Sequence, residues 1–298
     1  MLSDGFKKVS PIQDSEIVSD RCLHVNSVAG LIQAIGYIKW MVANAKTDVP
    51  HGVVFRGQCE NYPSMAPSLY RNISKTSTKP KKDALLRAFQ ESLKIPTGEP
   101  IEKYLSVESY YIEPLFQHYG IQTHWLDVVD NIWVALWFAC HRCIANFKPL
   151  ISFSLRPCMN HEKANIKKPK KEEFQESYCY IFLLSVPLYG EIHHSGHYIS
   201  AKTEIIDLRY CIPSIYLRPH TQHGLVMRMK TKTGGTSIDF KESVEAVIRI
   251  DLSNALEWIG KDLLLSTRNL FPPPHIDTGL SLLLGIPQLR GQLDLPVA

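Results

Sequence analysis

Polar side chains with the potential for chemistry are concentrated in the segment QHYGIQTHWLD, which runs from Gln117 to Asp127. A histidine can exchange a proton near neutral pH, and a carboxylate bound to one ring nitrogen fixes its tautomer. His118 and Asp127 offer this pairing, which would leave the second ring nitrogen of His118 for a ribose hydroxyl or a phosphate. Tyr119 and Thr123 add hydroxyl groups. This segment is therefore the first candidate for a ligand-binding or catalytic site.

Arg56 is a second candidate, because it lies near the end of the apolar, β-branched run at residues 51–58 that predicts a buried strand. A buried guanidinium needs a partner, since it stays charged. Two interpretations are open: an ion pair with Asp127 that braces the fold, or a bidentate contact to a phosphate or carboxylate of a ligand. Amide side chains that could orient a ligand, or else bind the backbone, are those of Gln58, Gln117 and Gln222.

The element that follows the polar segment would position it. Apolar residues recur at helical spacing from Ile132 to Phe147, and they occupy nearly all faces, which predicts a buried central helix. Asp130 or Asn131 would cap the start of this helix. The positive end of its dipole would then face the polar segment, where an anion or a nucleotide could be held.

The other elements follow from the same patterns. Helices are expected at residues 25–41, 83–93, 108–116 and 253–258, and strands at residues 51–58, 150–155, 178–186, 224–230 and 245–250. Helices mainly in the first half and strands mainly in the second predict an α+β fold with a mixed or antiparallel sheet. We expect a lead-in segment at residues 1–24 and a single domain at residues 25–298, with basic loop insertions at about 75–82 and 160–173.

Composition limits the class of protein. A chain of 298 residues that is 45% hydrophobic and 21% charged is typical of a folded globular protein. The net charge of +4 permits contact with a nucleotide or nucleic acid without requiring it. No stretch approaches the roughly 18 apolar residues of a membrane helix, and the N-terminal residues lack an apolar signal core. Because the seven cysteines are scattered and odd in number, they indicate reduced thiols. We therefore expect a cytoplasmic protein that does not contact membranes.

Metal binding is not expected. Cys140 and Cys143 have CxxC spacing, but no second pair follows at the distance of a zinc finger. His193, His194 and His197 are interpreted as a polar surface turn. The P-loop, nucleophile-elbow, HExxH and GxGxxG motifs are absent from the sequence, so the enzyme classes that use them lack support.

Several sequence blocks, in order, resemble the FRG domain family, which is named for an aromatic-Arg-Gly motif. The blocks are FRGQ at 55–58, PSLYR at 67–71, QHYG at 117–120, LD at 126–127, ALWFA at 135–139, RPHTQHG at 218–224 and LFP at 270–272 with Gly279. The chain departs from the family at two places. Val128 and Val129 follow Asp127 where the family usually has Trp-Thr, and His124 and Trp125 replace a common Arg-Leu pair.

The aromatic-Arg-Gly motif at a strand end is also similar to the first strand of arginine-type ADP-ribosyltransferases, where the arginine contacts the dinucleotide. This resemblance implies an NAD-dependent ADP-ribosyltransferase-like enzyme that acts on a macromolecular acceptor. The residues that would bind NAD are Arg56, Gly57, Gln58, Arg71, Thr123, Asp127 and Gln222. His118 and Tyr119 would lie around the nicotinamide ribose as catalytic residues.

Cleavage of the bond to nicotinamide needs a carboxylate near the developing positive charge. Glu204 and Glu245 are the candidates, although neither belongs to the Glu-x-Glu pair of arginine-specific transferases. The alternative is a non-catalytic module that binds a nucleotide or nucleic acid through Arg56, Arg71 and the basic loops. A carboxylate that faces a cleft between Arg56 and His118 would favour the enzyme.

Overall fold

The computed structural model describes residues 12–46, 49–71, 78–147, 149–157, 177–188, 191–231 and 237–296. The helices in these residues are α1 (Val28–Ala43), α2 (Lys79–Glu91), α3 (Ile101–Leu105), α4 (Ser109–His118), α5 (Ile132–Cys140), α7 (Leu208–Cys211), α8 (Leu217–Thr221), α9 (Leu252–Trp258), α10 (Thr267–Leu270) and α11 (Thr278–Gly285), with the short 3-10 helices η2 (Ser68–Tyr70) and η5 (Lys241–Ser243). The strands are β1 (Ser15–Ser19), β2 (Cys22–Val25), β3 (His51–Gln58), β4 (Leu126–Val129), β5 (His141–Phe147), β6 (Leu150–Leu155), β7 (Tyr178–Pro187), β8 (Glu191–His194), β9 (His197–Ile199), β10 (Thr203–Asp207), β11 (Gly224–Met229), β12 (Val244–Asp251) and β13 (Leu295–Pro296).

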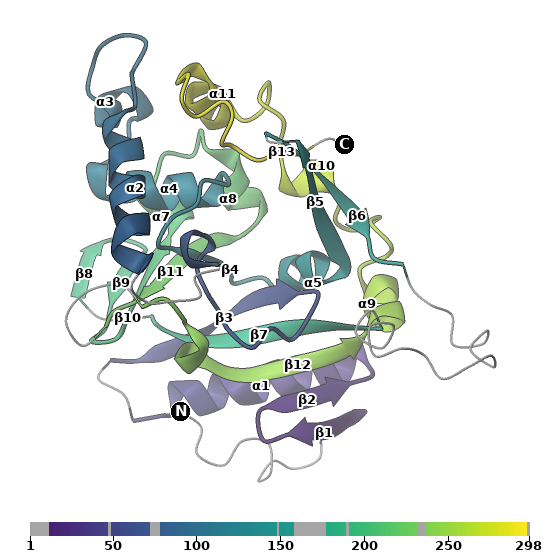
Figure 1. Ribbon diagram of the computed structural model, residues 1–298. Helices are drawn as coiled ribbons and strands as arrows, with labels where there is room; N and C mark the ends of the chain where they lie inside the picture. Colours follow the sequence, from purple (N-terminus) through teal and green to yellow (C-terminus); the bar gives the residue numbers. More distant parts are fainter. Residues whose placement is uncertain are drawn as a thin grey trace.

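One large sheet organises the fold (Figure 1), with the strand order β1-β2-β12-β7-β3-β4-β11-β10-β9-β8. Its pairs are antiparallel except for β12 and β2, which run parallel, so the sheet is mixed. A second, smaller sheet has the order β13-β6-β5. Helices and strands together make the α+β fold that the sequence predicts.

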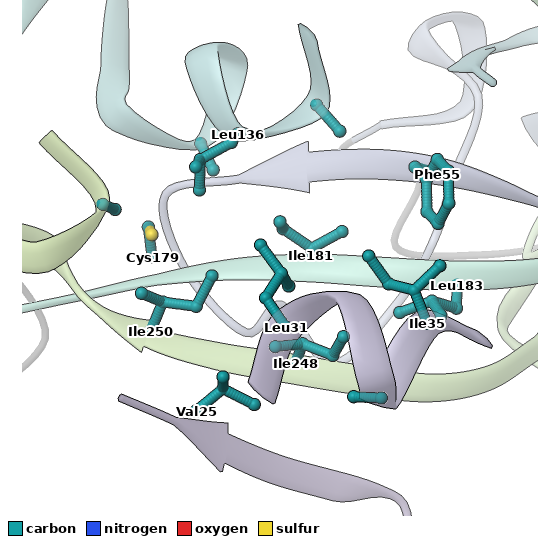
Figure 2. Close-up of a cluster of buried hydrophobic side chains, with 14 of the residues drawn as sticks. Val25, Leu31, Ile35, Phe55, Leu136, Cys179, Ile181, Leu183, Ile248 and Ile250 are labelled. Atoms are coloured by element: carbon teal, nitrogen blue, oxygen red, sulfur yellow. The ribbon is translucent and has the colours of Figure 1, made fainter. Parts of the chain in front are cut away.

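The main hydrophobic core lies between the sheet and helices α1, α5 and α9. Figure 2 shows Leu31 and Ile35 of α1 packed against Ile181 and Leu183 of β7, beside the strand β12. Alternate residues of β7 face the opposite side of the sheet, where Phe182 and Leu184 join another buried cluster. Since both faces of β7 are covered, the strand reads as an unbroken apolar run instead of an alternating one.

A further core packs α4 and the residues after it against α3, α7 and α11 on the other part of the sheet. Tyr111 and Leu115 of α4 and Leu283 of α11 belong to this cluster, as does Ile206 of β10. The chain between α4 and β4 therefore runs from this second core back to the middle of the large sheet, where β4 pairs with β3 and β11.

The central helix is shorter than the sequence predicts. Asn131 caps α5, accepting hydrogen bonds from the amides of Trp133 and Val134. The helix ends at Cys140, and the residues expected to continue it form β5 instead. The prediction of a helix through Phe147 was therefore wrong, because β5 pairs antiparallel with β6 and the ladder replaces the helical hydrogen bonds.

Three predicted loop or lead-in segments also differ. The segment assigned to the lead-in, residues 1–24, contains β1 and most of β2, because β2 is buried along its length and pairs with β12. Residues 79–82 form the start of α2. Residues 191–199 form the β8–β9 hairpin, where a histidine-rich turn was expected. Residues 72–77, and the predicted basic loop at 160–173, lie outside the described residues.

No helix in the described ranges is both long and apolar enough to cross a bilayer.

Candidate functional site

A cleft of about 920 Å³ opens on the large sheet at β3 and β4. Its volume lies within the range of roughly 300–1,000 Å³ that small-molecule sites occupy. The residues selected from the sequence that line it are Arg56, Gly57, Gln58, Arg71, Gln117, His118, Asp127 and Gln222. The strand end and the polar segment before the central helix are thus brought together, although Gln58 and His118 are 60 positions apart in the sequence.

Each of the three positions of the aromatic-Arg-Gly motif requires its residue type for a different physical reason. Phe55 is buried in the main core, and because side chains alternate along a strand, Arg56 projects toward the cleft. Gly57 lies against α5: a Cβ atom there would be 1.7 Å from the carbonyl oxygen of Ala135 and 2.9 Å from the amide nitrogen of Ala139. The absence of a side chain at Gly57 therefore lets the helix backbone pack directly onto β3.

The Arg56 guanidinium is incompletely satisfied by the protein. Its Nη1 donates a hydrogen bond to the main-chain carbonyl oxygen of Asp127, and its buried Nε has no hydrogen-bond partner. Burial, together with the charge of Arg71, lowers the pKa of Arg56 to about 10, against the opposing effect of Asp127. Arg56 is still charged at neutral pH, so two cations lie near each other beside an open cavity. This arrangement favours an anionic ligand.

The Asp127 carboxylate faces the cleft and keeps a side-chain exposure of 37%. It accepts a hydrogen bond from Gln117 Nε2 at 2.6 Å and lies 3.3 Å from His118 Nδ1. Burial by itself would raise the pKa of Asp127, but the contacts with His118, Arg56 and Gln117 outweigh it and hold the pKa below its ordinary value. The group is therefore an oriented, ionised carboxylate at neutral pH.

The residues that contact Asp127 are themselves held in place by neighbouring side chains. Gln117 Oε1 accepts hydrogen bonds from the hydroxyl groups of Thr123 at 2.8 Å and Ser68 at 3.2 Å, which fixes its amide with the nitrogen toward Asp127. His118 Nε2, expected to contact a ligand, is buried without a hydrogen-bond partner. It lies against Gly224, where a Cβ atom would be 2.7 Å away. His118, which borders the cleft, and Thr123, which does not, therefore hold the carboxylate in position.

Three residues selected as catalytic lie elsewhere. Tyr119 is fully buried, and its hydroxyl donates to Asp277 Oδ2 at 2.7 Å. Glu204 lies on β10, two strands away from β4, and Glu245 lies on β12. Neither glutamate lines the cleft. The carboxylates that do so among the described residues are those of Asp127, Asp239 and Asp294.

Glu204 belongs to a closed polar cluster. It accepts from Arg228 Nε at 2.8 Å and from the Tyr110 hydroxyl, and it lies 2.9 Å from His197 Nε2. Burial would raise the pKa of Glu204, but hydrogen bonds from His197 and Tyr110 and the charge of Arg228 lower it to about 2. Since its oxygens are engaged in this way, Glu204 braces β9, β10 and β11 against α4.

Sequence reasoning missed a third arginine of the cleft, Arg218. Its side chain is 1% exposed, lies over the Tyr119 ring at 4.4 Å and donates from Nη2 to the carbonyl oxygen of Asp294 at 3.0 Å. Burial lowers its pKa, and its Nε has no hydrogen-bond partner. The sequence feature that could have indicated Arg218 is its position in the block RPHTQHG, four residues before Gln222.

An aromatic group of the cleft was also missed. Phe138, Phe153 and Phe271 line the same cavity as Arg56. Their apolar character indicated core positions, and no sequence pattern separates a ring that faces the core from one that faces a cavity. Among the described residues, no group of three or more histidine, cysteine, aspartate or glutamate side chains is placed to hold a metal ion.

Comparison with known proteins bears on the segment that builds this site. Residues 51–146 match the model of the FRG domain, which is about a third of the chain. Comparison with curated proteins and with solved structures gives no significant match. The matched segment contains Arg56, Gly57, His118 and Asp127, whereas Arg218 and Phe271 lie beyond it. The chain therefore contains an FRG domain at residues 51–146, and this domain supplies the Arg56 and Asp127 walls of the cleft.

Proposed function

We propose that the cleft binds a nucleotide through its phosphates, with NAD as the ligand. The observation that supports this proposal is the Arg56 guanidinium, which faces the cavity beside Arg71 with its Nε unpaired. A buried donor without a partner is costly, and a phosphate oxygen is a strong acceptor for it. Binding a phosphate would satisfy this donor and reduce the repulsion between the two arginines.

The amide side chains of the cleft divide between two roles. Gln58 Oε1 is buried without a hydrogen-bond partner, while its Nε2 lies 3.6 Å from the sulfur of Met65. An unpaired acceptor of this kind suits a ribose hydroxyl. Gln222 Nε2 donates to the carbonyl oxygen of Leu270 at 2.8 Å, so Gln222 holds the segment that precedes Phe271.

The proposal predicts that Arg56→Lys folds normally but loses the stabilisation that NAD provides. Lysine keeps the charge but not the fork of donors. Affinity for NAD should fall by roughly 1.5–3 kcal/mol, the contribution of a hydrogen bond to a charged group. Melting curves with and without millimolar NAD measure both effects. Arg87→Lys, the same change at an exposed position of α2, is the matched control and should respond to NAD like the wild type.

Two results would count against a phosphate contact at Arg56. A wild-type protein whose melting temperature does not rise with NAD would remove NAD as the ligand. An Arg56→Lys protein that melts at a lower temperature without NAD, yet keeps the full response to NAD, would instead assign Arg56 to bracing Asp127.

A second candidate, ADP-ribosyltransferase-like chemistry, is favoured by the position of the Asp127 carboxylate. In this reaction the bond between nicotinamide nitrogen and ribose C1′ breaks, and nicotinamide leaves with the bonding electrons. Asp127 would stabilise the positive charge that develops on the ribose. An oxygen of a macromolecular acceptor, or of water, then attacks C1′ and releases its proton to solvent. Asp127 thus takes the place that the sequence offered to Glu204 or Glu245.

This chemistry predicts that the wild-type protein releases nicotinamide from NAD and that Asp127→Asn releases it roughly 10²–10³ times more slowly, the usual effect of removing one stabilising group. Because the pKa of Asp127 is lowered, protonation of this group should not reduce the rate between neutral pH and the ordinary carboxyl pKa of about 3.9. Glu245→Gln, the same carboxylate-to-amide change outside the cleft, should keep the rate.

Release of nicotinamide at the wild-type rate by Asp127→Asn would refute the role of Asp127. NAD binding by the wild type without any release would favour the non-catalytic nucleotide-binding module.

A further inference from the structure

The cleft has an aromatic wall in addition to its arginines. Phe138 of α5, Phe153 of β6 and Phe271, which follows α10, line the cavity and each keeps partial exposure. The Phe153 and Phe271 rings are stacked, with centroids 4.8 Å apart and planes 26° from parallel. The plane of the Phe138 ring is inclined by 69° to that of Phe153 and by 85° to that of Phe271.

This wall is braced from behind by Trp137. The Trp137 ring is fully buried and lies within 5.2 Å of both Phe138 and Phe153, measured between centroids. It stacks on His141 at 3.9 Å, and its Nε1 donates to Asp262 at 3.0 Å. Because the rings are held in place before a ligand arrives, binding to them costs little further ordering of side chains.

Because these apolar rings stay partly exposed in the cavity, they lack the stabilisation that full burial would give them, and a planar ligand would restore it. The same cavity contains Arg56, Arg71 and Arg218, so the ligand that fits has an anionic part as well. Phosphate alone or a sugar phosphate would leave the rings exposed. A planar aromatic group joined to phosphates satisfies both features.

We propose that the wall formed by Phe138, Phe153 and Phe271 is the subsite for the base of a nucleoside phosphate. This inference rests on the proposed nucleotide site at Arg56 and adds the residues that contact the base. Arg218 lies over the Phe271 ring at 5.2 Å, and Phe153 stacks on the same ring. Since Phe271 is held by these two neighbours, Phe138 and Phe153 are the rings assigned to contact the base.

Calorimetric titration with ADP and with inorganic pyrophosphate tests the subsite. ADP should bind the wild-type protein at least roughly tenfold more tightly than pyrophosphate, in line with the energy of stacking one base on aromatic side chains. Phe153→Leu should remove most of that preference and leave the affinity for pyrophosphate unchanged. Phe89→Leu, the same change on α2 away from the cleft, should keep the wild-type preference for ADP over pyrophosphate. Where Phe153→Leu lowers the melting temperature, Phe138→Leu takes its place in the same assay.

The possible results separate this inference from the proposal on which it rests. Binding of neither ligand by the wild type would overturn both. Equal affinity of the wild type for ADP and pyrophosphate would overturn the base subsite and leave the phosphate site at Arg56 supported. If Phe153→Leu lowers the affinities for ADP and for pyrophosphate by the same factor, the base subsite is also overturned.

Discussion

Gly57→Ala should destabilise the protein by at least about 3 kcal/mol, the upper part of the range for overpacked cores. The new methyl group would lie 1.7 Å from the carbonyl oxygen of Ala135 and 2.8 Å from its carbonyl carbon. These are backbone atoms of α5, so no change of rotamer relieves the clash. The helix would have to move away from β3, and Phe138, which lies on α5, would move with it.

Urea unfolding of Gly57→Ala measures this effect. Gly36→Ala is a control of opposite sign: Gly36 lies within α1, and a Cβ atom there meets no atom within 4 Å. Alanine at that position should stabilise the protein by roughly 0.5–1 kcal/mol, since glycine inside a helix is unfavourable by that amount. An unfolding midpoint of Gly57→Ala equal to that of the wild type would show that α5 does not pack against β3 as closely as described.

Asp277→Ala should cost roughly 3–5 kcal/mol, the loss expected when one partner of a buried charged network is removed. The Asp277 side chain is fully buried and accepts hydrogen bonds from the Tyr119 hydroxyl at 2.7 Å and from the amides of Leu280 at 3.0 Å and Leu217 at 3.2 Å. It also caps α11 and accepts from the amide of Arg218 at 3.3 Å. Alanine would leave these donors buried without a partner.

The matched control for this change is Asp130→Ala. Asp130 pairs with Arg209 at 2.6 Å, but its side chain is 41% exposed, and exposed pairs contribute about 0–1 kcal/mol. Tyr119→Phe removes a single hydroxyl from the Asp277 network and should lie between the two, near the 0.5–1.5 kcal/mol of one ordinary hydrogen bond. A loss in Asp277→Ala no greater than in Asp130→Ala would contradict the bracing role of Asp277.

The local elements near the site could be predicted because their patterns are local. The unbroken apolar runs of β3 and β7 and the helical spacing in α1 and α4 depend on neighbouring residues alone, and each predicted element is present, with ends that differ by a few residues. Strand alternation also places Phe55 and Arg56 on opposite faces. The end of α5 was not predictable in the same way, because β5 exists only through its pairing with β6.

Within the site, the sequence by itself determined the Arg56 strand, the polar segment that contains His118 and Asp127, and the glycine at residue 57. Tertiary structure alone decided which of the candidate carboxylates shares the cleft with Arg56: β4 pairs with β3 and brings Asp127 to the cleft, while the order of the sheet places Glu204 on β10. It also decided that Gly224 of β11 covers His118 Nε2. The chemistry of each side chain follows from its residue type. Which side chains face one cavity depends on the pairing of strands that are distant in the chain, and no local pattern specifies that pairing.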